Sequence, residues 1–486
     1  MNKFSKFAYC LAFAILIIWN LWSLVYSPIA WFDEVYFASA THSLISGNGL
    51  SVELDHYQPL VIYGPVYFLF TGAVTKLFGF GIFQFRIVNL LFAFLSVILL
   101  GKILNKLGVS KGMNLFIQIL LLTDALFISN SHSGRMEFVA LSFVLAAYYC
   151  FLNQFNSATM KAMLISLLLT LATLTTLRVV VICVPIAIAQ LIELFKARSW
   201  SGLVVYFLIP IFLYGVWIYV AFGSIAGMIS YFTQLPPDGF VQKSLFERFA
   251  RGNWIILKFH YPMIFTAVLS IFYLLKNGKI KDIIVYIAPI IIYYFIVTDT
   301  GMYGVLILPF YMIIIALGLT ELASASHKVY SFSYNMLLLL CLVLNCSIFV
   351  VKAFSVIMTK ERRNPMQATM LIKDNIPYGS KVAGDYPYYY AAIDNGCQFK
   401  RIFREGAKVE SVFDDVISNF RPDYIVLRNN SYDKKMQSLL KKSGFEKIKC
   451  YKFEDDGKVF FGQLLDKFNY RITATYEGDI YKKREQ

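Results

Sequence analysis

The sequence predicts a polytopic α-helical membrane protein that carries a soluble α/β domain at its C-terminal end. Of the 486 residues, 58% are hydrophobic and 15% are charged, whereas soluble globular chains have about 25% charged residues. Uncharged or nearly uncharged runs recur at 9–25, 87–104, 203–222 and 336–351, and several of them are long enough to span a bilayer. Residues 360–486 contain 18 of the 30 acidic and 24 of the 45 basic side chains. We therefore divide the chain into a membrane domain, 1–359, and a soluble domain, 360–486.

We expect about eleven transmembrane helices, because that many apolar runs have a suitable length. They lie near 7–28, 84–104, 113–130, 136–152, 161–177, 179–195, 203–222, 254–275, 282–298, 303–320 and 333–355. The first run is long enough to be a retained span and not a cleaved signal peptide. A further apolar segment, 61–79, is interrupted by Gly64-Pro65, so we expect a re-entrant or interfacial helix there.

Lysine and arginine mark one side of these helices. With the N-terminus in the cytoplasm, almost every short cytoplasmic loop carries Lys or Arg, whereas the short outside loops 131–134 and 299–302 carry neither. An odd number of spans then places the C-terminal domain outside the cytoplasm, together with two large loops at 29–83 and 223–253. We expect the plasma membrane of a bacterium or an archaeon.

The soluble domain alternates strand and helix patterns. The segments "SKVAGD", "DYIVLRN" and "KVFFGQLL" predict strands, and "AKVESVFDDVISNF" and "DKKMQSLLKKS" predict helices. This domain also contains Cys397 and Cys450, which could form a disulfide in an oxidising space. In the 223–253 loop, "SLFERFA" is amphipathic and predicts a helix on the membrane surface.

The composition argues against two other classes of protein. The net charge of +15 does not arise from a basic stripe with interleaved aromatic residues, so nucleic acid is not an expected partner. In membrane proteins an excess of basic residues reflects topology and contact with anionic lipids. None of the seven cysteines forms a CxxC or a Cys/His spacing typical of metal sites.

Acidic residues are scarce in the membrane domain, and two of them, Asp33 and Glu34, are adjacent where the first apolar run ends. Ionisable groups within or beside a bilayer usually serve a function. The pair could equally cap the helix that "VYFASATHSLI" predicts, because negative charge stabilises a helix N-terminus. Asp124 lies in the apolar run "LLTDALF", where a buried acid should have a partner.

A second polar group lies in the short outside turn "SNSHSGRMEF". It contains His132, Arg135 and Glu137 at the start of a helix, where Arg135 could pair with Glu137 or bind an anion. Arg86 and Arg178 lie at the same outer level of their helices. An arginine there either binds phosphate or extends along apolar surface to the membrane interface.

The order of these motifs resembles the GT-C glycosyltransferases, and among them the protein O-mannosyltransferase and aminoarabinose transferase group. The similar stretches include "WFDEVYFASA", "YQPLVIYGPVYFLFTGAVTKLFGFGIFQFRIVNLLFAFL" and "SHSGRMEFVALSF", within about the first 150 residues. That group carries an acidic pair, a Pro-Leu segment, a Phe-Gly turn, an arginine that enters helix 2 and an Arg-x-acid motif. The corresponding positions here are Asp33-Glu34, Pro59-Leu60, Phe78-Gly79, Arg86 and Arg135-x-Glu137. Arg178 takes the place of the lysine in the group's Lys-Pro helix pair.

The resemblance implies a GT-C fold and transfer of a sugar from a polyprenyl-phosphate donor to a lipid, glycan or protein acceptor outside the membrane. An inverting transfer needs a base for the acceptor hydroxyl and a cation for the leaving phosphate. Asp33 is the expected base, Glu34 orients it or holds a cation, and Arg135 and Glu137 line the pocket. No cofactor is required by the pattern, and a divalent Mg or Mn ion on Asp33 and Glu34 is left open. Membrane lipids are the remaining expected partners.

The sequence departs from the group where the aminoarabinose branch binds phosphate. That branch has a basic residue soon after its acidic pair and a lysine before its Pro-Pro, and this chain has neither. Arg86, Arg135, Arg178 or His56 would then bind the donor, with His132 as a further substrate-binding candidate. The late helix "GMYGVLILPFYMIIIALGL" lacks the arginine that the group often has before its tyrosine. The alternative function is a transporter or lipid flippase, although the two halves show no inverted repeat.

Overall fold

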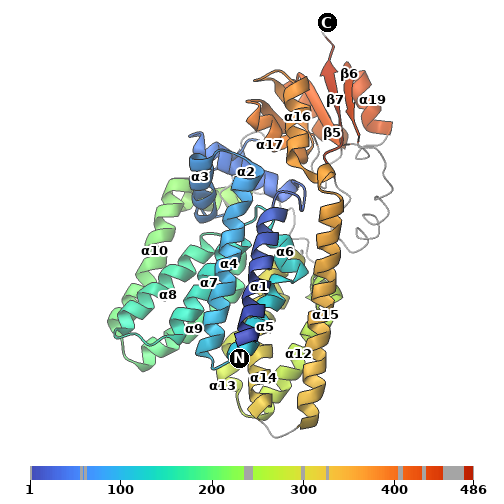
Figure 1. Cartoon of the computed structure of the whole chain (residues 1–486). Coiled ribbons are helices and arrows are strands. Elements are labelled where there is room, and N and C mark those ends of the chain that lie inside the picture. The colour runs from blue at the N-terminus through green and yellow to red at the C-terminus, as the bar shows by residue number, and fades with distance from the viewer. Residues whose placement is uncertain are drawn as a thin grey trace.

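The computed structural model shows a long helical bundle with a small sheet domain at one end (Figure 1). It describes residues 3–54, 58–59, 63–234, 245–296, 301–324, 328–402, 409–428, 434–452 and 475–484. The bundle is built from α1 (Lys3–Ser23), α4 (Ile82–Lys106), α5 (Lys111–Leu122), α6 (Ala125–Ser131), α7 (Glu137–Leu152), α8 (Ala158–Thr173), α9 (Val180–Lys196), α10 (Trp200–Phe222), α11 (Ile225–Gln234), α12 (Leu245–Lys276), α13 (Ile280–Ile296), α14 (Leu308–Ser324) and α15 (Lys328–Met358). Two 3₁₀ turns, η1 (Leu177–Val179) and η2 (Gly301–Leu306), precede α9 and α14.

Helices occupy all eleven ranges in which the apolar runs predicted a span. In the described part of the chain, four helical segments are long and apolar enough to cross a membrane alone, namely α4, η1 with α9, α10, and 335–358 of α15. The pair α5–α6 makes a fifth if it is counted as one broken span. The exact number of spans therefore stays a prediction.

The span predicted at 113–130 is wrong as a single helix, because α5 and α6 meet there at a bend of 61°. Asp124 explains the break. Its carboxylate oxygen Oδ1 accepts hydrogen bonds from the backbone N–H groups of Leu126 at 2.8 Å and Phe127 at 3.0 Å. An aspartate in this position caps the N-terminus of a new helix. Its other oxygen, Oδ2, lies 2.6 Å from Nε2 of His260 on α12, which is the partner that a buried acid requires.

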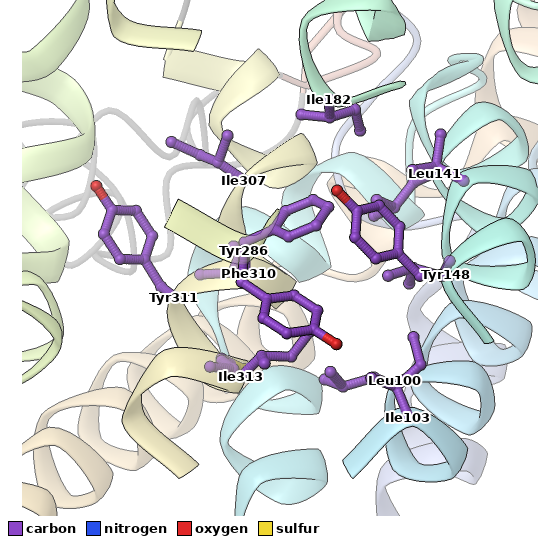
Figure 2. Close-up of a cluster of buried hydrophobic side chains, with 14 of the residues drawn as sticks. Leu100, Ile103, Leu141, Tyr148, Ile182, Tyr286, Ile307, Phe310, Tyr311 and Ile313 are labelled. Atoms are coloured by element: carbon purple, nitrogen blue, oxygen red, sulfur yellow. The ribbon is translucent and has the colours of Figure 1, made fainter. Parts of the chain in front are cut away.

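Large apolar side chains from α4, α7, α9, α13 and α14 meet in a buried core of the bundle (Figure 2). Tyr148 of α7 lies with its ring centroid 5.8 Å from that of Tyr286 on α13 and 5.2 Å from that of Phe310 on α14. The Tyr148 hydroxyl donates to the backbone oxygen of Val285, so its polar end is satisfied within this core. These contacts join α7, α13 and α14.

The segment between α1 and α4 forms a layer on top of the bundle, under the sheet domain (Figure 1). It contains α2 (Phe32–Ile45), an antiparallel pair of β1 (Ser51–Val52) and β2 (Gln58–Pro59), and α3 (Val66–Phe78). α3 is the helix that we expected within 61–79. Its 13 residues are about 20 Å long, which is shorter than the hydrocarbon core of a bilayer.

The C-terminal domain is a five-stranded sheet with the order β4-β3-β5-β7-β6. The first three strands are parallel, and β7 and β6 are antiparallel to their neighbours. The elements are α16 (Pro365–Asn375), β3 (Lys381–Gly384), α17 (Tyr389–Asp394), β4 (Gln398–Arg401), α18 (Val409–Asp415), β5 (Tyr424–Arg428), α19 (Lys434–Lys442), β6 (Phe445–Tyr451) and β7 (Gly478–Lys483). Their alternation produces the α/β domain that the sequence pattern predicted.

Most local predictions for this domain agree with the structure. "SKVAGD" and "DYIVLRN" contain β3 and β5, and "DKKMQSLLKKS" contains α19. "AKVESVFDDVISNF" contains α18, followed by a π-helical turn at 416–420. The strand expected at "KVFFGQLL" lies outside the described residues. Cys397 and Cys450 are free thiols. The surface helix expected at "SLFERFA" is not separate, because α12 continues from Leu245 to Lys276.

The sheet domain rests directly on the α2–α3 layer. Lys400 Nζ donates to the backbone oxygen of Glu53, and the ring of Tyr386 lies 5.3 Å from that of Phe32. Where the domain joins α15, Arg363 Nη1 donates to the backbone oxygen of Tyr26 at 2.9 Å. The domain therefore covers the layer that carries Asp33 and Glu34.

We predict that a reporter fused after Gln486 is exported, because the sheet domain follows α15 at the end of the bundle opposite the start of α1 (Figure 1). An alkaline phosphatase fusion, which is active only outside the cytoplasm, measures this. A fusion after Gly108, in the loop between α4 and α5 that is predicted to be cytoplasmic, is the matched control and should be inactive. An inactive fusion after Gln486 together with an active one after Gly108 would reverse the topology.

Candidate active site

Asp33 and Glu34 form the first turn of α2 and point in different directions. Successive residues of an α-helix are about 100° apart around its axis, so adjacent side chains face different neighbours. Trp31 precedes the helix in extended conformation and provides no side-chain cap. The two carboxylates therefore bring negative charge to the helix N-terminus, where the macrodipole favours it.

Glu34 pairs with Arg86, the arginine near the start of α4. Arg86 Nε donates to Glu34 Oε1 and Nη2 donates to Oε2, both at 2.7 Å, and Nη1 donates to the backbone oxygen of Leu24 at 2.7 Å. Neither side chain is exposed to solvent. Both oxygens of Glu34 are thus occupied in a bidentate, fully buried ion pair, which joins α2 to α4.

The sheet domain contributes a third polar group to this pair. Tyr390 of α17 donates its hydroxyl to Glu34 Oε1 at 3.4 Å. Burial, together with the negative charge of Glu34, raises the pKa of the Tyr390 phenol well above its ordinary value. The hydroxyl therefore keeps its proton and remains a donor across the physiological pH range.

Asp33 pairs with a different arginine, Arg135, which follows α6. Arg135 Nη1 donates to Asp33 Oδ2. The same guanidinium binds Glu137, with Nη2 at 2.6 Å from Oε1 and Nε at 3.1 Å from both carboxylate oxygens. Arg135 and Glu137 are each 3% exposed, whereas Asp33 is 29% exposed. Asp33 is thus the carboxylate of this group that solvent or a substrate can reach.

The turn that carries Arg135 is held against Glu34 and α4. Asn89 Nδ2 donates to the backbone oxygen of Ser133 at 2.8 Å. Gly134 has no room for a side chain, because a Cβ there would lie 2.2 Å from the ring of Phe85 and 3.0 Å from Cγ of Glu34. A glycine is required for this close approach. The turn packs the two ion-pair groups side by side.

Arg178 and Tyr303 complete the constellation. The guanidinium of Arg178, in η1, lies 4.0 Å from the ring centroid of Tyr303 in η2. The Arg135 guanidinium lies 5.1 Å from the same centroid and 5.5 Å from the ring of Trp31. The structure therefore places Asp33, Arg135, Glu137 and Arg178 in one cluster.

Two predicted site residues, His132 and Arg86, do not contact Asp33 or Arg135. His132 is buried and lines a narrow crevice with Ser27 and Lys352, between α1, α6 and α15 and apart from the contacts of Asp33. His56 lies outside the described residues. Arg86 lies in the protein interior with Glu34 and is not exposed for contact with a substrate.

The carboxylates do not fit a divalent cation shared by Asp33 and Glu34. Both oxygens of Glu34 accept from Arg86, and Oδ2 of Asp33 accepts from Arg135. Within the described ranges there is no group of three or more His, Cys, Asp or Glu side chains arranged to hold a metal ion. A shared cation would have to displace both arginines from their carboxylates.

Sequence reasoning missed three aromatic residues around this cluster. Trp31 and Tyr303 lie against Arg135, and Tyr63 is close enough to interact electrostatically with Asp33 and Arg178. Trp31 lies two residues before Asp33, and this proximity was a usable signal. Tyr303 is 125 positions from Arg178, and the spacing in the sequence gives no sign of their contact.

Comparisons with known proteins bear on the fold. The sequence matches no family model and no curated protein. The structure of ArnT from Cupriavidus metallidurans bound to undecaprenyl phosphate is similar, with a TM-score of 0.59 and 11% identity over 98% of this chain and 99% of that chain. The oligosaccharyltransferase of Archaeoglobus fulgidus, tethered with an acceptor peptide, gives 0.50 and 10% over 93% of this chain and 73% of that one. Arabinofuranosyltransferase AftD from Mycobacteria gives 0.51 and 11% over 99% and 40%.

These three structures belong to the GT-C glycosyltransferases. This chain has the GT-C fold. The fold predicted from the ordered motifs is thereby confirmed. It places the α2–α3 layer and the turn at 132–135 together at one end of the bundle, where Asp33 meets Arg135.

We predict that Arg86→Met strongly destabilises the protein, because it leaves Glu34 as an uncompensated buried charge. Breaking a buried ion pair from one side costs about 3–5 kcal/mol. Thermal unfolding of the purified protein in detergent should show a midpoint lowered by several degrees. Lys102→Met, an exposed change on the same helix, is the control and should unfold like the wild type. An unchanged midpoint for Arg86→Met would contradict the structural role of the pair.

Proposed function

We propose that this protein is an integral-membrane glycosyltransferase that moves a sugar from a polyprenyl-phosphate donor to an acceptor outside the membrane. The observation that carries the proposal is Asp33, a half-buried carboxylate held by Arg135 at one end of a GT-C bundle. A transporter would need a polar path through the bundle. The cluster of Asp33, Arg135, Glu137 and Arg178 lies at one end of the bundle, and a large core of packed apolar side chains lies within the bundle (Figure 2).

Asp33 has the geometry of a base. Arg135 binds its oxygen Oδ2, whereas Oδ1 makes no hydrogen bond to any described residue. A general base must lie within hydrogen-bond reach of the proton that it takes, so an available and oriented oxygen is the first requirement. Glu34 and Glu137 do not meet it, because arginine nitrogens occupy both oxygens of each carboxylate.

The reaction follows from these roles. Oδ1 of Asp33 takes the proton of the acceptor hydroxyl as that oxygen attacks the anomeric carbon of the sugar. The bond from this carbon to the phosphate oxygen breaks, and its electron pair stays on the phosphate. The products are the glycosylated acceptor and the polyprenyl phosphate, with the proton on Asp33. Attack opposite to the leaving group inverts the configuration at the anomeric carbon.

The classes of donor and acceptor are proposed from the chemistry and from similar structures. ArnT is seen with undecaprenyl phosphate, and the archaeal oligosaccharyltransferase is seen with an acceptor peptide. A phosphate leaving group needs cationic stabilisation, which the arginines of this cluster provide. The acceptor here is a hydroxyl group of a lipid, glycan or protein. The sheet domain covers the α2–α3 layer on the outer side, where an acceptor would enter.

We predict that Asp33→Asn lowers sugar transfer by about 10²-fold or more. Asparagine keeps the size and the acceptor oxygen of the side chain, but it cannot take the proton. Membranes that contain the protein and its native acceptor are supplied with radiolabelled polyprenyl-phosphate sugars. Thin-layer analysis then measures how much label leaves the donor.

Asp394→Asn is the matched control, because it makes the same replacement in an exposed ion pair with Lys373 in the sheet domain. It should transfer sugar like the wild type, since exposed pairs contribute about 0–1 kcal/mol. Full transfer by a stably folded Asp33→Asn protein would exclude Asp33 as the base.

A further inference from the structure

The shared ring of Tyr303 holds two guanidinium groups in fixed positions. Arg178 lies 4.0 Å and Arg135 5.1 Å from its centroid, so the two guanidinium carbons are at most about 9 Å apart. Tyr303 is itself only 7% exposed and belongs to the main apolar core, together with Val305 and Leu306 of the same turn. An arginine on this ring is thus fixed relative to the bundle.

The two arginines differ in what they can still bind. The Nε, Nη1 and Nη2 groups of Arg135 all donate to Asp33 or Glu137. Arg178 is exposed, and no carboxylate among the described residues forms an ion pair with it. Arg135 is therefore paired with two carboxylates, whereas Arg178 is paired with none among the described residues. An incoming anion would be repelled at the first arginine and attracted at the second.

We propose that Arg178 is the residue that binds the phosphate of the donor, and that Tyr303 is the positioning residue that holds it for this purpose. This rests on the proposed function. A guanidinium that lies over an aromatic ring uses its flat face for the ring, and its N–H groups remain directed outward along its edge. That edge matches the paired oxygens of a phosphate.

The placement of these groups in one cluster suits the reaction. Asp33 is bonded to Arg135, and Arg135 and Arg178 both contact the ring of Tyr303. A base and a phosphate-binding cation must be separated by the width of one sugar, because the acceptor and the leaving group occupy opposite sides of the anomeric carbon. As the bond to the phosphate breaks, the electron pair moves onto an oxygen beside Arg178, where positive charge stabilises it.

Binding of undecaprenyl phosphate alone tests this inference without knowledge of the sugar. The full-length protein in detergent is titrated, and tryptophan fluorescence gives the dissociation constant. Arg178→Ala should raise this constant about 10²-fold, because it removes charge-assisted hydrogen bonds to phosphate. Tyr303→Leu should raise it about tenfold, because it removes the platform but not the charge. Tyr303→Phe keeps the ring and should bind within about twofold of the wild type.

Two further variants test whether Tyr303 affects binding by positioning Arg178 or by a general effect on protein stability. The double variant Arg178→Ala/Tyr303→Leu should bind no worse than Arg178→Ala, because the ring acts through the arginine. Tyr149→Leu removes a comparable contact, in which Lys102 lies 5.5 Å from the ring, near the other end of α4. It should bind undecaprenyl phosphate like the wild type. If Tyr303→Leu does not fold, Arg178→Lys replaces it, since lysine keeps the charge but cannot stack, and it should weaken binding several-fold.

The outcomes distinguish the two proposals. If Arg178→Ala binds undecaprenyl phosphate as tightly as the wild type, this inference is wrong. It is also wrong if Tyr303→Leu and Arg178→Lys both bind like the wild type. Either result would leave the glycosyltransferase proposal unaffected. Additive losses in the double variant would assign Tyr303 a purely structural role and would also overturn it. A wild-type protein that does not bind undecaprenyl phosphate would overturn the proposed donor class itself.

Discussion

The buried pair between Glu34 and Arg86 is the interaction on which the outer layer of this protein depends. It ties α2 to α4 by two 2.7 Å hydrogen bonds, and it occupies the only two acceptor oxygens of Glu34. Because both charges are fully buried, any rotation or shift of α2 that separates them would leave each charge without compensation. The rotation of α2 about its axis is thereby fixed, and the neighbouring Asp33 is directed toward Arg135. Tyr390 extends the same constraint to the sheet domain.

The remaining charges acquire distinct roles from this arrangement. Each guanidinium nitrogen of Arg135 donates to Asp33 or Glu137, and the two carboxylates outweigh its positive charge, so Arg135 orients a carboxylate and does not attract an anion. Arg178 has the ring of Tyr303 as its neighbour and keeps its hydrogen-bonding edge. Similar residue types in one cluster thus differ in function because they differ in partners. The chemistry that we propose needs this asymmetry, with a base at one side of the sugar and a cation at the other.

The sequence predicted the helices and the motif-bearing turns well, because apolar length and the ordered acidic and basic residues are local signals. The sequence did not predict the bend between α5 and α6, because the apolar run there contains neither Gly nor Pro. Asp124 was the single local sign of the bend. The sequence also did not predict that Asp33 and Glu34 pair with different arginines. Adjacent carboxylates look alike in a sequence, and only tertiary packing decides which arginine each one meets. The contact of Arg178 with Tyr303 joins segments 125 positions apart and has no local signature at all.

The sharing of Arg135 by two carboxylates has an evolutionary consequence. One guanidinium that serves two carboxylates makes positions 33, 135 and 137 a single unit, because losing any member changes the charge balance of the other two. Lysine cannot reproduce the forked geometry of the guanidinium group. Substitution of Arg135 by lysine would therefore not preserve its bonds to both carboxylates. Lineages that alter this triplet are therefore expected to change its members together, and the three columns should covary among homologues. Arg178 contacts the ring of Tyr303 and no carboxylate of this triplet, so its column should vary independently of these three.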